Sequence, residues 1–292
     1  MAQPRHRPRA SAYDPAVALE FFRSAGKEQE ALKGATIFSE NRVGIPLIMP
    51  NRIYLLVEGE VGVFVKEEHI ATIAAGEVFG EMASMAGAPR SGTAVAMSHS
   101  KVIGLDDAQF DKALRKRPGF ALMLMSVMAN RLRDTLSRLG PDSAPAEADA
   151  RDAVVLESQM LDDLVQVIGP TAKFRYAPGK LIMREGERGV ALYAVLEGRV
   201  AISIGDAVVE RVGPGGVFGE MSLVDREPRL ASAAAETECV LLAMSRHMFL
   251  HLVKTSPKFG AAMLKSVGER AAFTASRLAK AAPAEGKAAA AA

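Results

Sequence analysis

The segment Phe79-Gly80-Glu81-Met82-Ala83 in the first half of the chain reappears in the second half as Phe218-Gly219-Glu220-Met221-Ser222. Each segment is followed at the same distance by a proline and an arginine, which are Pro89-Arg90 and Pro228-Arg229. A recurrence at fixed spacing is the signature of a repeated structural unit. The two segments therefore predict that the chain contains two copies of one domain.

The likeness between the two halves continues on both sides of these segments at one constant shift of 139 positions. At this shift Tyr54 falls on Tyr193 and Arg131 falls on Arg270, and no gap is needed from Tyr54 to Leu139. The turn-forming run at residues 140–145 then predicts a linker between the copies. The expected units are a disordered basic tail over residues 1–14, a first domain over 15–139, a linker over 140–151, a second domain over 152–279 and a low-complexity tail over 280–292.

Inside each copy the pattern predicts a helix, then short strands, then further helices. Asp14 followed by Pro15 is typical of a helix start, because aspartate caps free N–H groups and proline suits the first turn. Residues 200–204 alternate between branched apolar and small side chains, which is the period of a half-buried strand, and residues 61–65 keep the same phase. Many short strands with glycine turns indicate an α+β fold, with two tandem β-rolls (jelly rolls) and flanking helices.

The two repeated segments, extended to residues 79–93 and 218–232, are called cassette 1 and cassette 2. In each cassette a glycine before the acid lets the backbone approach a ligand, and the short helix that follows offers N–H groups to an anion. Arg90 and Arg229 each supply a planar fork of donors that matches two phosphate oxygens. A glutamate beside a phosphate needs an uncharged partner, such as a sugar hydroxyl. Each cassette therefore predicts a site for a ribose and a phosphate.

At these residues both copies resemble cyclic nucleotide-binding domains, the family of the catabolite activator-type regulators and the protein kinase A regulatory subunits. The resemblance covers about residues 54–139 and 174–278. It implies that the cassette glutamate binds the ribose 2′-hydroxyl, that the cassette arginine binds the cyclic phosphate, and that the glycine backbone helps to hold the sugar. The residues implied as ligand-binding are Gly80, Glu81, Arg90, Ser91, Thr135, Gly219, Glu220, Arg229 and Thr274.

Two of these residues bear on which base is bound. Thr135 lies 45 residues after Arg90 and Thr274 lies 45 residues after Arg229, on the helices that close each copy. The resemblance implies that a threonine here reads the adenine amino group, which favours cyclic AMP. Because a threonine hydroxyl both donates and accepts hydrogen bonds, it does not by itself exclude cyclic GMP.

The copies depart from the family pattern in two places. Copy one lacks the glycine turns that copy two has at Gly179 and Gly186, and its first hairpin is expected to be about five residues shorter. In cassette 2, Leu230 follows the arginine where cassette 1 has Ser91, so the hydroxyl expected at the phosphate is missing. The two sites are therefore expected to differ in affinity.

The closing helices suggest how a signal leaves the sites. Residues 125–139 carry Met and Leu at steps of three and four, the pattern of a coiled-coil seam, and residues 264–278 carry a slimmer apolar face. We expect these helices either to pair within one chain, as a pseudo-dimer, or to join two chains as a homodimer. Nucleotide would pull each helix towards the base and shift a two-state hinge.

Composition excludes several other classes. The formal net charge of +2 argues against an extended nucleic-acid surface, and the single cysteine, Cys239, excludes an internal disulfide and a cysteine-built zinc site. No apolar run approaches the roughly 20 residues that a membrane span requires. No helix-turn-helix follows the second copy, and no catalytic motif or metal-ligand cluster is visible. We therefore expect neither an enzyme nor a DNA-binding protein, with no cofactor, no metal and a cytoplasmic location.

The sequence thus predicts a tandem receptor for a cyclic nucleotide that regulates a separate effector protein, which the sequence does not identify. The alternative is an interaction scaffold that keeps the fold but no longer binds nucleotide. Leu230 and the expected short hairpin of copy one keep this alternative open. An ion pair between the acid and the arginine would contribute little stability if exposed, so it explains poorly why the whole cassette occurs twice.

Overall fold

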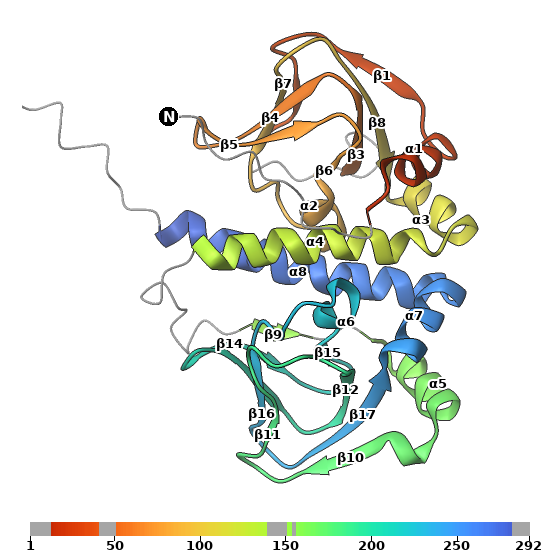
Figure 1. Ribbon diagram of the computed structural model, residues 1–292, viewed down its shortest axis with the longest axis vertical. Helices are drawn as coiled ribbons and strands as arrows, with labels where there is room; N and C mark the ends of the chain where they lie inside the picture. Colours follow the sequence, from red (N-terminus) through yellow and green to blue (C-terminus); the bar gives the residue numbers. More distant parts are fainter. Residues whose placement is uncertain (1–12, 41–50, 139–150, 154–155, 282–292) are drawn as a thin grey trace, which may run out of the picture.

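The computed structural model describes residues 13–40, 51–138, 151–153 and 156–281, with side chains except at 135–138, 151–153 and 274–281. Most of both expected tails and of the expected linker lies outside these residues. Figure 1 shows two β-rolls at opposite ends of the molecule, with two long helices side by side between them.

The first β-roll and its helices are built from residues 15–138. Its elements are α1 (Pro15–Arg23), β1 (Glu28–Ala31), β2 (Thr36–Phe38), β3 (Arg52–Glu58), β4 (Glu60–Val65), β5 (Glu68–Ala74), β6 (Val78–Phe79), α2 (Glu81–Ala86), β7 (Thr93–Ala96), β8 (Ser100–Asp106), α3 (Asp107–Lys116) and α4 (Phe120–Arg138).

The second β-roll repeats this order. Its elements are β9 (Arg151–Ala153), α5 (Ser158–Ile168), a 3₁₀ turn (Pro170–Ala172), β10 (Lys173–Tyr176), β11 (Leu181–Met183), β12 (Ala191–Glu197), β13 (Val200–Ile204), β14 (Ala207–Val212), β15 (Val217–Phe218), α6 (Met221–Asp225), β16 (Ser232–Ala235), β17 (Cys239–Ser245), α7 (Arg246–Thr255) and α8 (Pro257–Ala281).

Each domain contains two antiparallel four-stranded sheets that face each other. The strand orders are β1-β8-β3-β6 and β2-β7-β4-β5 in the first domain, and β10-β17-β12-β15 and β11-β16-β13-β14 in the second. In the second domain β9 adds to β14 as a parallel fifth strand, and it begins at Arg151, the last residue of the expected linker. The predicted α+β fold, with two tandem β-rolls and flanking helices, is confirmed.

Local sequence explains how several of these elements begin and which way they face. The carboxylate of Asp14 accepts hydrogen bonds from the N–H groups of Ala16 and Val17, so it caps α1 as expected. In β13, Val200 and Ile202 are buried while Ala201 is half-buried, which agrees with the predicted alternation. The second closing helix begins at Pro257.

The connection from β2 to β3 in copy one is longer than expected, and it is not a hairpin, because β2 and β3 lie in different sheets. β2 pairs with β7 at Thr36 and Val95, and β11 pairs with β16 at Leu181 and Ala234. Val95 and Ala234 are related by the repeat shift of 139, whereas Thr36 and Leu181 are 145 positions apart. Between this strand and the next, copy one therefore has six more residues than copy two. The prediction of a shortened hairpin is wrong, because it aligned residues 47–49 with β11.

A glycine turn precedes β2 in copy one and β11 in copy two. Gly34 and Gly179 both have positive φ, of 85° and 78°, where an L side chain is disfavoured. Their N–H groups donate to the carbonyl oxygens of Ala96 and Ala235, at 2.8 and 2.7 Å. Gly34 is therefore the counterpart of Gly179, and the counterpart of Gly186 falls outside the described residues.

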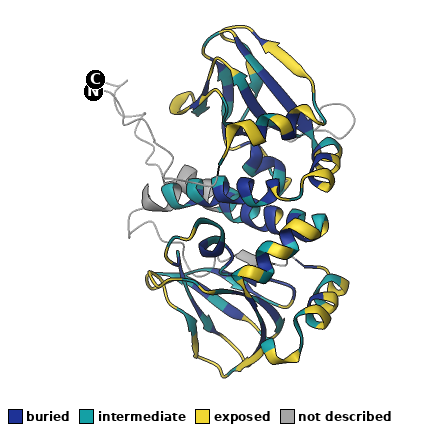
Figure 2. Cartoon of the chain, turned by 45° about the vertical axis from the view of Figure 1, so that its right-hand side comes forward, coloured by how far each residue is buried: buried dark blue, intermediate teal, exposed yellow. Residues whose placement is uncertain are grey.

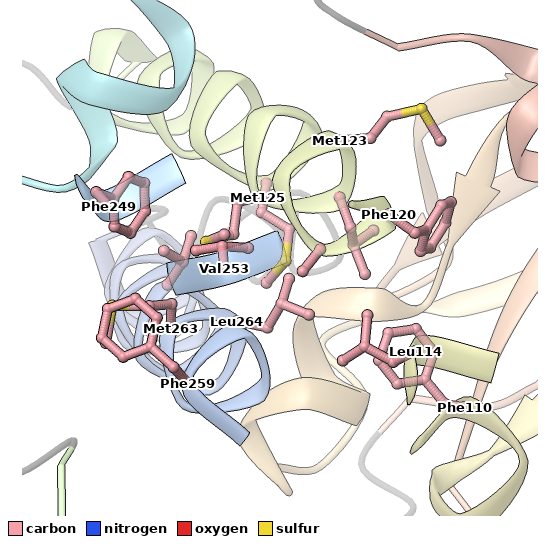
Figure 3. Packing of buried hydrophobic residues seen from close by; sticks show 14 of the residues in the cluster. Phe110, Leu114, Phe120, Met123, Met125, Phe249, Val253, Phe259, Met263 and Leu264 are labelled. Atoms are coloured by element: carbon pink, nitrogen blue, oxygen red, sulfur yellow. The ribbon is translucent and has the colours of Figure 1, made fainter. Parts of the chain in front are cut away.

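The helices α4 and α8 pack against each other and join the two domains into one core. The shared cluster includes Met125 and Met128 of α4 and Met263, Leu264 and Val267 of α8, all fully buried. Figure 3 shows Met125 and Leu264 in the space between the two helices, and Figure 2 shows buried residues concentrated where the helices meet. The expected pairing of the closing helices within one chain is thus present.

None of the described helices is both long enough and apolar enough to cross a lipid bilayer.

Candidate functional site

The arginine of cassette 1 is buried against the backbone of its own domain. Arg90 is only 5% exposed, and its Nη1 and Nη2 atoms donate to the carbonyl oxygens of Gly80 and Arg52, each at 2.5 Å. Its guanidinium carbon lies 4.3 Å from the centre of the Phe38 ring, within the range of a cation–π contact. The guanidinium is therefore held by carbonyl dipoles and an aromatic face.

The arginine of cassette 2 has the equivalent pair of carbonyl partners and one further partner. The Nη1 atom of Arg229 donates to the Gly219 carbonyl at 2.5 Å, and Nη2 donates to the Ala191 carbonyl. Nη1 also donates to the Ser222 hydroxyl at 2.8 Å, and the equivalent position in cassette 1 is Ala83. Ser222 therefore gives Arg229 a partner that Arg90 lacks, and the sequence alone does not indicate this contact.

The buried charge of each cassette arginine is incompletely compensated. Among the described residues, neither Arg90 nor Arg229 forms an ion pair. Burial lowers the pKa of both guanidinium groups below the ordinary arginine value, and the charges of Tyr54 and Glu81 near Arg90, and of Tyr193 and Glu220 near Arg229, only partly offset this. A cation taken out of water without a paired anion is costly, and an incoming anion would relieve that cost.

The glycines of the cassettes are required by both conformation and space. Gly80 and Gly219 have φ of 72° and 83°. A Cβ at these positions would lie 2.8 Å from the Nη1 of Arg90 and 2.6 Å from the Nη1 of Arg229. The arginine of the same cassette thus lies close to the glycine, and the predicted approach of this backbone to a ligand stays a prediction.

The acid of cassette 1 is bound to the closing helix of its domain. Glu81 is the first residue of α2 and is 1% exposed, and its Oε1 atom accepts from the Nη1 of Arg131 on α4 at 2.6 Å. The Nη2 of Arg131 donates to the Val78 carbonyl at 2.7 Å. Burial alone would lower the pKa of Arg131, but the Glu81 carboxylate raises it above its usual value. The acid thus links the cassette to α4.

The acid of cassette 2 makes the equivalent link through a larger network. Glu220 is 1% exposed and accepts from the Nη1 of Arg270 on α8, whose Nε donates to Glu210 at 2.9 Å. Although burial opposes it, the pKa of Arg270 is raised by these two carboxylates. The second oxygen of Glu220, Oε2, is buried and has no hydrogen-bond partner among the residues that the structure describes. A buried acceptor without a donor is unusual in a folded protein, so this atom is available to a ligand hydroxyl.

The structure thus brings Gly80, Glu81 and Arg90 together, and likewise Gly219, Glu220 and Arg229. Ser91 is exposed and Leu230 is half-buried, and in the described part of the chain neither side chain is hydrogen-bonded to a cassette arginine. The side chains of Thr135 and Thr274 lie outside the described residues, so their expected contact with the base stays a prediction. Arg131 and Arg270 were absent from the predicted site, although their identity across the repeat was the signal that could have identified them.

The described part of the chain contains no cluster of three or more His, Cys, Asp or Glu side chains arranged to hold a metal ion.

The model of the cyclic nucleotide-binding domain family matches residues 28–117 and 173–256, which together make up more than half of the chain. The chain belongs to this family. Each match spans one β-roll with its cassette, so the protein contains two cyclic nucleotide-binding domains in tandem, and the predicted resemblance is confirmed at the level of the family. A DNA-binding domain is not among the matches.

Among curated proteins, a cyclic nucleotide-gated potassium channel of Rhizobium etli is 36% identical over 116 residues, which cover 39% of this chain and 31% of the channel. The chain therefore spans about a third of the length of this relative.

Similar solved structures include regulatory subunits of protein kinase A. PfPKA-R with bound cAMP is 22% identical, with a TM-score of 0.30, over 82% of this chain and 76% of that chain. The regulatory domain of Toxoplasma gondii protein kinase A with cAMP is 21% identical, with a TM-score of 0.29, over 83% and 86%. The regulatory subunit of a cAMP-independent protein kinase A from Trypanosoma cruzi, bound to guanosine, is 18% identical, with a TM-score of 0.30, over 80% and 75%.

Proposed function

We propose that this protein is a receptor for a cyclic nucleotide, with one binding site in each cassette, and that it regulates a separate effector protein. The observation that carries the proposal is the buried guanidinium of Arg90 and of Arg229, for which no carboxylate among the described residues forms an ion pair. A cyclic phosphate brings one negative charge with two exocyclic oxygens, which suits a planar fork of donors. Each arginine would then exchange its carbonyl partners for a charged one.

The ribose is assigned to the carboxylates beside these arginines. Glu81 and Glu220 are already neutralised by Arg131 and Arg270, so they present hydrogen-bond acceptors without repelling the phosphate. The unpartnered Oε2 of Glu220 supports a sugar hydroxyl as its donor. A phosphate-binding arginine and a neutralised acid together suit a ribose that is joined to a phosphate.

We assign cyclic AMP as the preferred ligand, with cyclic GMP as the competing one. The support is the position of Thr135 and Thr274, which lie at the same distance after each cassette arginine on the helices that close the two domains. A threonine hydroxyl accepts from the adenine amino group, but it also donates. We therefore expect a moderate preference for cyclic AMP over cyclic GMP, which calorimetric titration with each nucleotide measures.

The signal is assigned to the closing helices. Arg131 on α4 and Arg270 on α8 are hydrogen-bonded to the cassette acids. A ligand hydroxyl that binds one of these acids would alter the contact of that acid with the arginine, and so act on the helix that carries the arginine. Both helices lie between the two domains, so their movement would reach the whole molecule (Figure 1). The effector that reads this movement is the second partner in the proposal.

Isothermal titration calorimetry of the full chain with cyclic AMP tests the proposal. We expect two molecules bound per chain, one in Arg90→Leu, one in Arg229→Leu, and none in the double variant. Loss of a charge-assisted bidentate contact should weaken the affected site about 100-fold or more. Arg175→Gln is the matched control, because Arg175 forms an ion pair with Glu238 in which both side chains are 72% exposed.

The alternative is a scaffold whose cassette arginines serve the fold alone. It is favoured by one observation, which is that both guanidinium groups already donate to carbonyl oxygens of the chain. On that interpretation the same titrations give no heat with cyclic AMP or cyclic GMP at millimolar concentration, while Arg90→Leu and Arg229→Leu still lower the midpoint of thermal unfolding. That pair of results would overturn the receptor proposal.

A further inference from the structure

The helix α4 of the first domain carries two arginines that face different domains. Arg131 binds Glu81 in cassette 1, whereas Arg133 binds Asp225 at the end of α6 in cassette 2. Successive helical residues are about 100° apart, so side chains two positions apart point to nearly opposite sides. One turn of α4 therefore contacts both cassettes of the chain.

The contact between Arg133 and Asp225 is bidentate and largely shielded from water. Nε of Arg133 donates to Oδ2 at 2.6 Å and Nη2 donates to Oδ1 at 3.2 Å. The two side chains are 16% and 2% exposed. Oδ1 of Asp225 also accepts from the N–H of Glu227 at 3.0 Å, in the turn that leads to Arg229. Such a buried pair has a defined geometry, and removal of one partner leaves a buried charge.

In the reciprocal contact between α8 and cassette 1, the positions equivalent to Arg133 and Asp225 cannot form such a pair. At the repeat shift of 139, the counterpart of Arg133 is Ala272 and the counterpart of Asp225 is Ala86. Here Gly268 of α8 lies against α2, close to Met85. The first domain thus reaches cassette 2 through an ion pair, while the equivalent positions of the second domain carry alanine and supply no such pair to cassette 1.

Asp225 lies at the end of the segment that places Arg229. That segment begins at Gly219, whose carbonyl accepts from Arg229, and includes Ser222, whose hydroxyl also accepts from it. α6 is only five residues long and its first-turn cap has no side-chain hydrogen bond, so it has little intrinsic stability of its own. An external contact at Asp225 therefore helps to fix the partners of Arg229.

We propose that Arg133 is a positioning residue for the second nucleotide site, supplied by the first domain. It holds Asp225 and through it the segment from Gly219 to Asp225, so that the Arg229 guanidinium stays where the phosphate binds. The first site does not depend on it, because cassette 1 is held by Arg131. Nucleotide binding at the second site then depends on the position of α4. The first domain acts on the second site in this way, whereas the second domain does not act on the first site through an equivalent pair. The proposal rests on the receptor function proposed above.

Site-specific titration of the full chain with cyclic AMP tests this inference. In an Arg90→Leu background, where only the second site binds, Arg133→Gln should weaken binding about tenfold, within the range of ordinary coupling between sites. In an Arg229→Leu background, where only the first site binds, the same change should alter affinity less than twofold. Asp225→Asn should reproduce both results, and the double variant should be no weaker than either single one. Equal losses at the two sites, or no loss at the second, would overturn the inference.

Hydrogen exchange of the ligand-free protein separates failure of this inference from failure of the receptor function. Arg133→Gln should speed amide exchange in residues 221–227 at least fivefold and leave residues 81–87 within twofold of the unsubstituted chain. Arg175→Gln should leave both segments unchanged. If no variant binds nucleotide, the receptor function fails and this exchange pattern still decides the role of Arg133. Unchanged exchange in residues 221–227 would contradict it.

Discussion

The glycine before each cassette acid illustrates how one residue meets two demands at once. Gly80 and Gly219 adopt positive φ, and the space that a side chain would fill is occupied by the arginine of the same cassette. A left-handed conformation costs an L residue about 1 kcal/mol or more, and many turns accept that cost. The contact below 3 Å between an added Cβ and the guanidinium is a second reason for glycine at these positions. It bears on the proposed ligand site, because the guanidinium belongs to that site.

A pair of alanine substitutions separates the effect of the positive φ from the effect of the contact with the arginine. Gly219→Ala and Gly179→Ala place alanine at similar positive φ, of 83° and 78°, but no atom lies within 4 Å of the Cβ added at Gly179. Gly179→Ala should lose about 1 kcal/mol of unfolding free energy in urea, and Gly219→Ala should lose at least as much, because its Cβ also meets the guanidinium. Only Gly219→Ala should also weaken cyclic AMP binding at the second site, by roughly tenfold, because it displaces Arg229. Equal affinity in the two variants would mean that the contact with Arg229 is irrelevant to binding.

The ion pairs between the cassette acids and the arginines of the closing helices predict how α4 and α8 respond to nucleotide. Glu81 with Arg131, and Glu220 with Arg270, connect each cassette to one helix. We expect saturating cyclic AMP to change hydrogen exchange in both α4 and α8. In Arg131→Met the response of α4 should be lost while α8 still responds, and in Arg270→Met the pattern should be reversed.

The two variants in this exchange experiment serve as controls for each other. Arg131→Met leaves one buried carboxylate, Glu81, without its cation, and Arg270→Met leaves two, Glu210 and Glu220. The cost is about 3 kcal/mol or more, so circular dichroism must first establish that each variant is folded. Exchange in α4 and α8 that is unaltered by nucleotide in the unsubstituted protein would show that the helices do not carry the signal. Equal responses of both helices in Arg131→Met would show that the signal reaches α4 by another route.

For the helices and strands, the sequence predicted features that depend on neighbouring residues or that recur in both copies. The cap at Asp14, the alternation in β13 and the composition of the cassettes depend on neighbouring residues, and each was recognised. The connection after β2 was misjudged, because the shift between the copies changes there from 139 to 145. Gly34 with Gly179 and Ile37 with Ile182 carry that signal in the sequence, and strand pairing establishes it. Contacts such as that of Arg133 with Asp225 join residues 92 positions apart and occur in one copy only, so no repeat marks them.

For the whole molecule, the main unknown at the level of sequence was how the closing helices pair. Apolar seams predicted that they pair, but the same seams suit a contact within one chain or between two. The arrangement of α4 against α8, with each helix also touching the cassette helix of the other domain, depends on the fit of two complete domains (Figure 1). Because one apolar cluster runs through both domains, we expect them to unfold together in a single cooperative transition.

Two glycines of α8 test this shared core. A Cβ at Gly268 would lie 2.9 Å from the Cβ of Met85 and 3.3 Å from the backbone N of Ala86, whereas a Cβ at Gly260 would meet nothing closer than 3.4 Å. Gly260→Ala should therefore raise the unfolding free energy by about 0.5–1 kcal/mol, since alanine favours a helix. Gly268→Ala should lower it by about 1–3 kcal/mol, because α8 must move away from α2. Urea denaturation followed by circular dichroism measures both changes. A gain of stability in Gly268→Ala equal to that in Gly260→Ala would contradict the close packing of α8 on the first domain, and with it the single core that makes the two domains one unit.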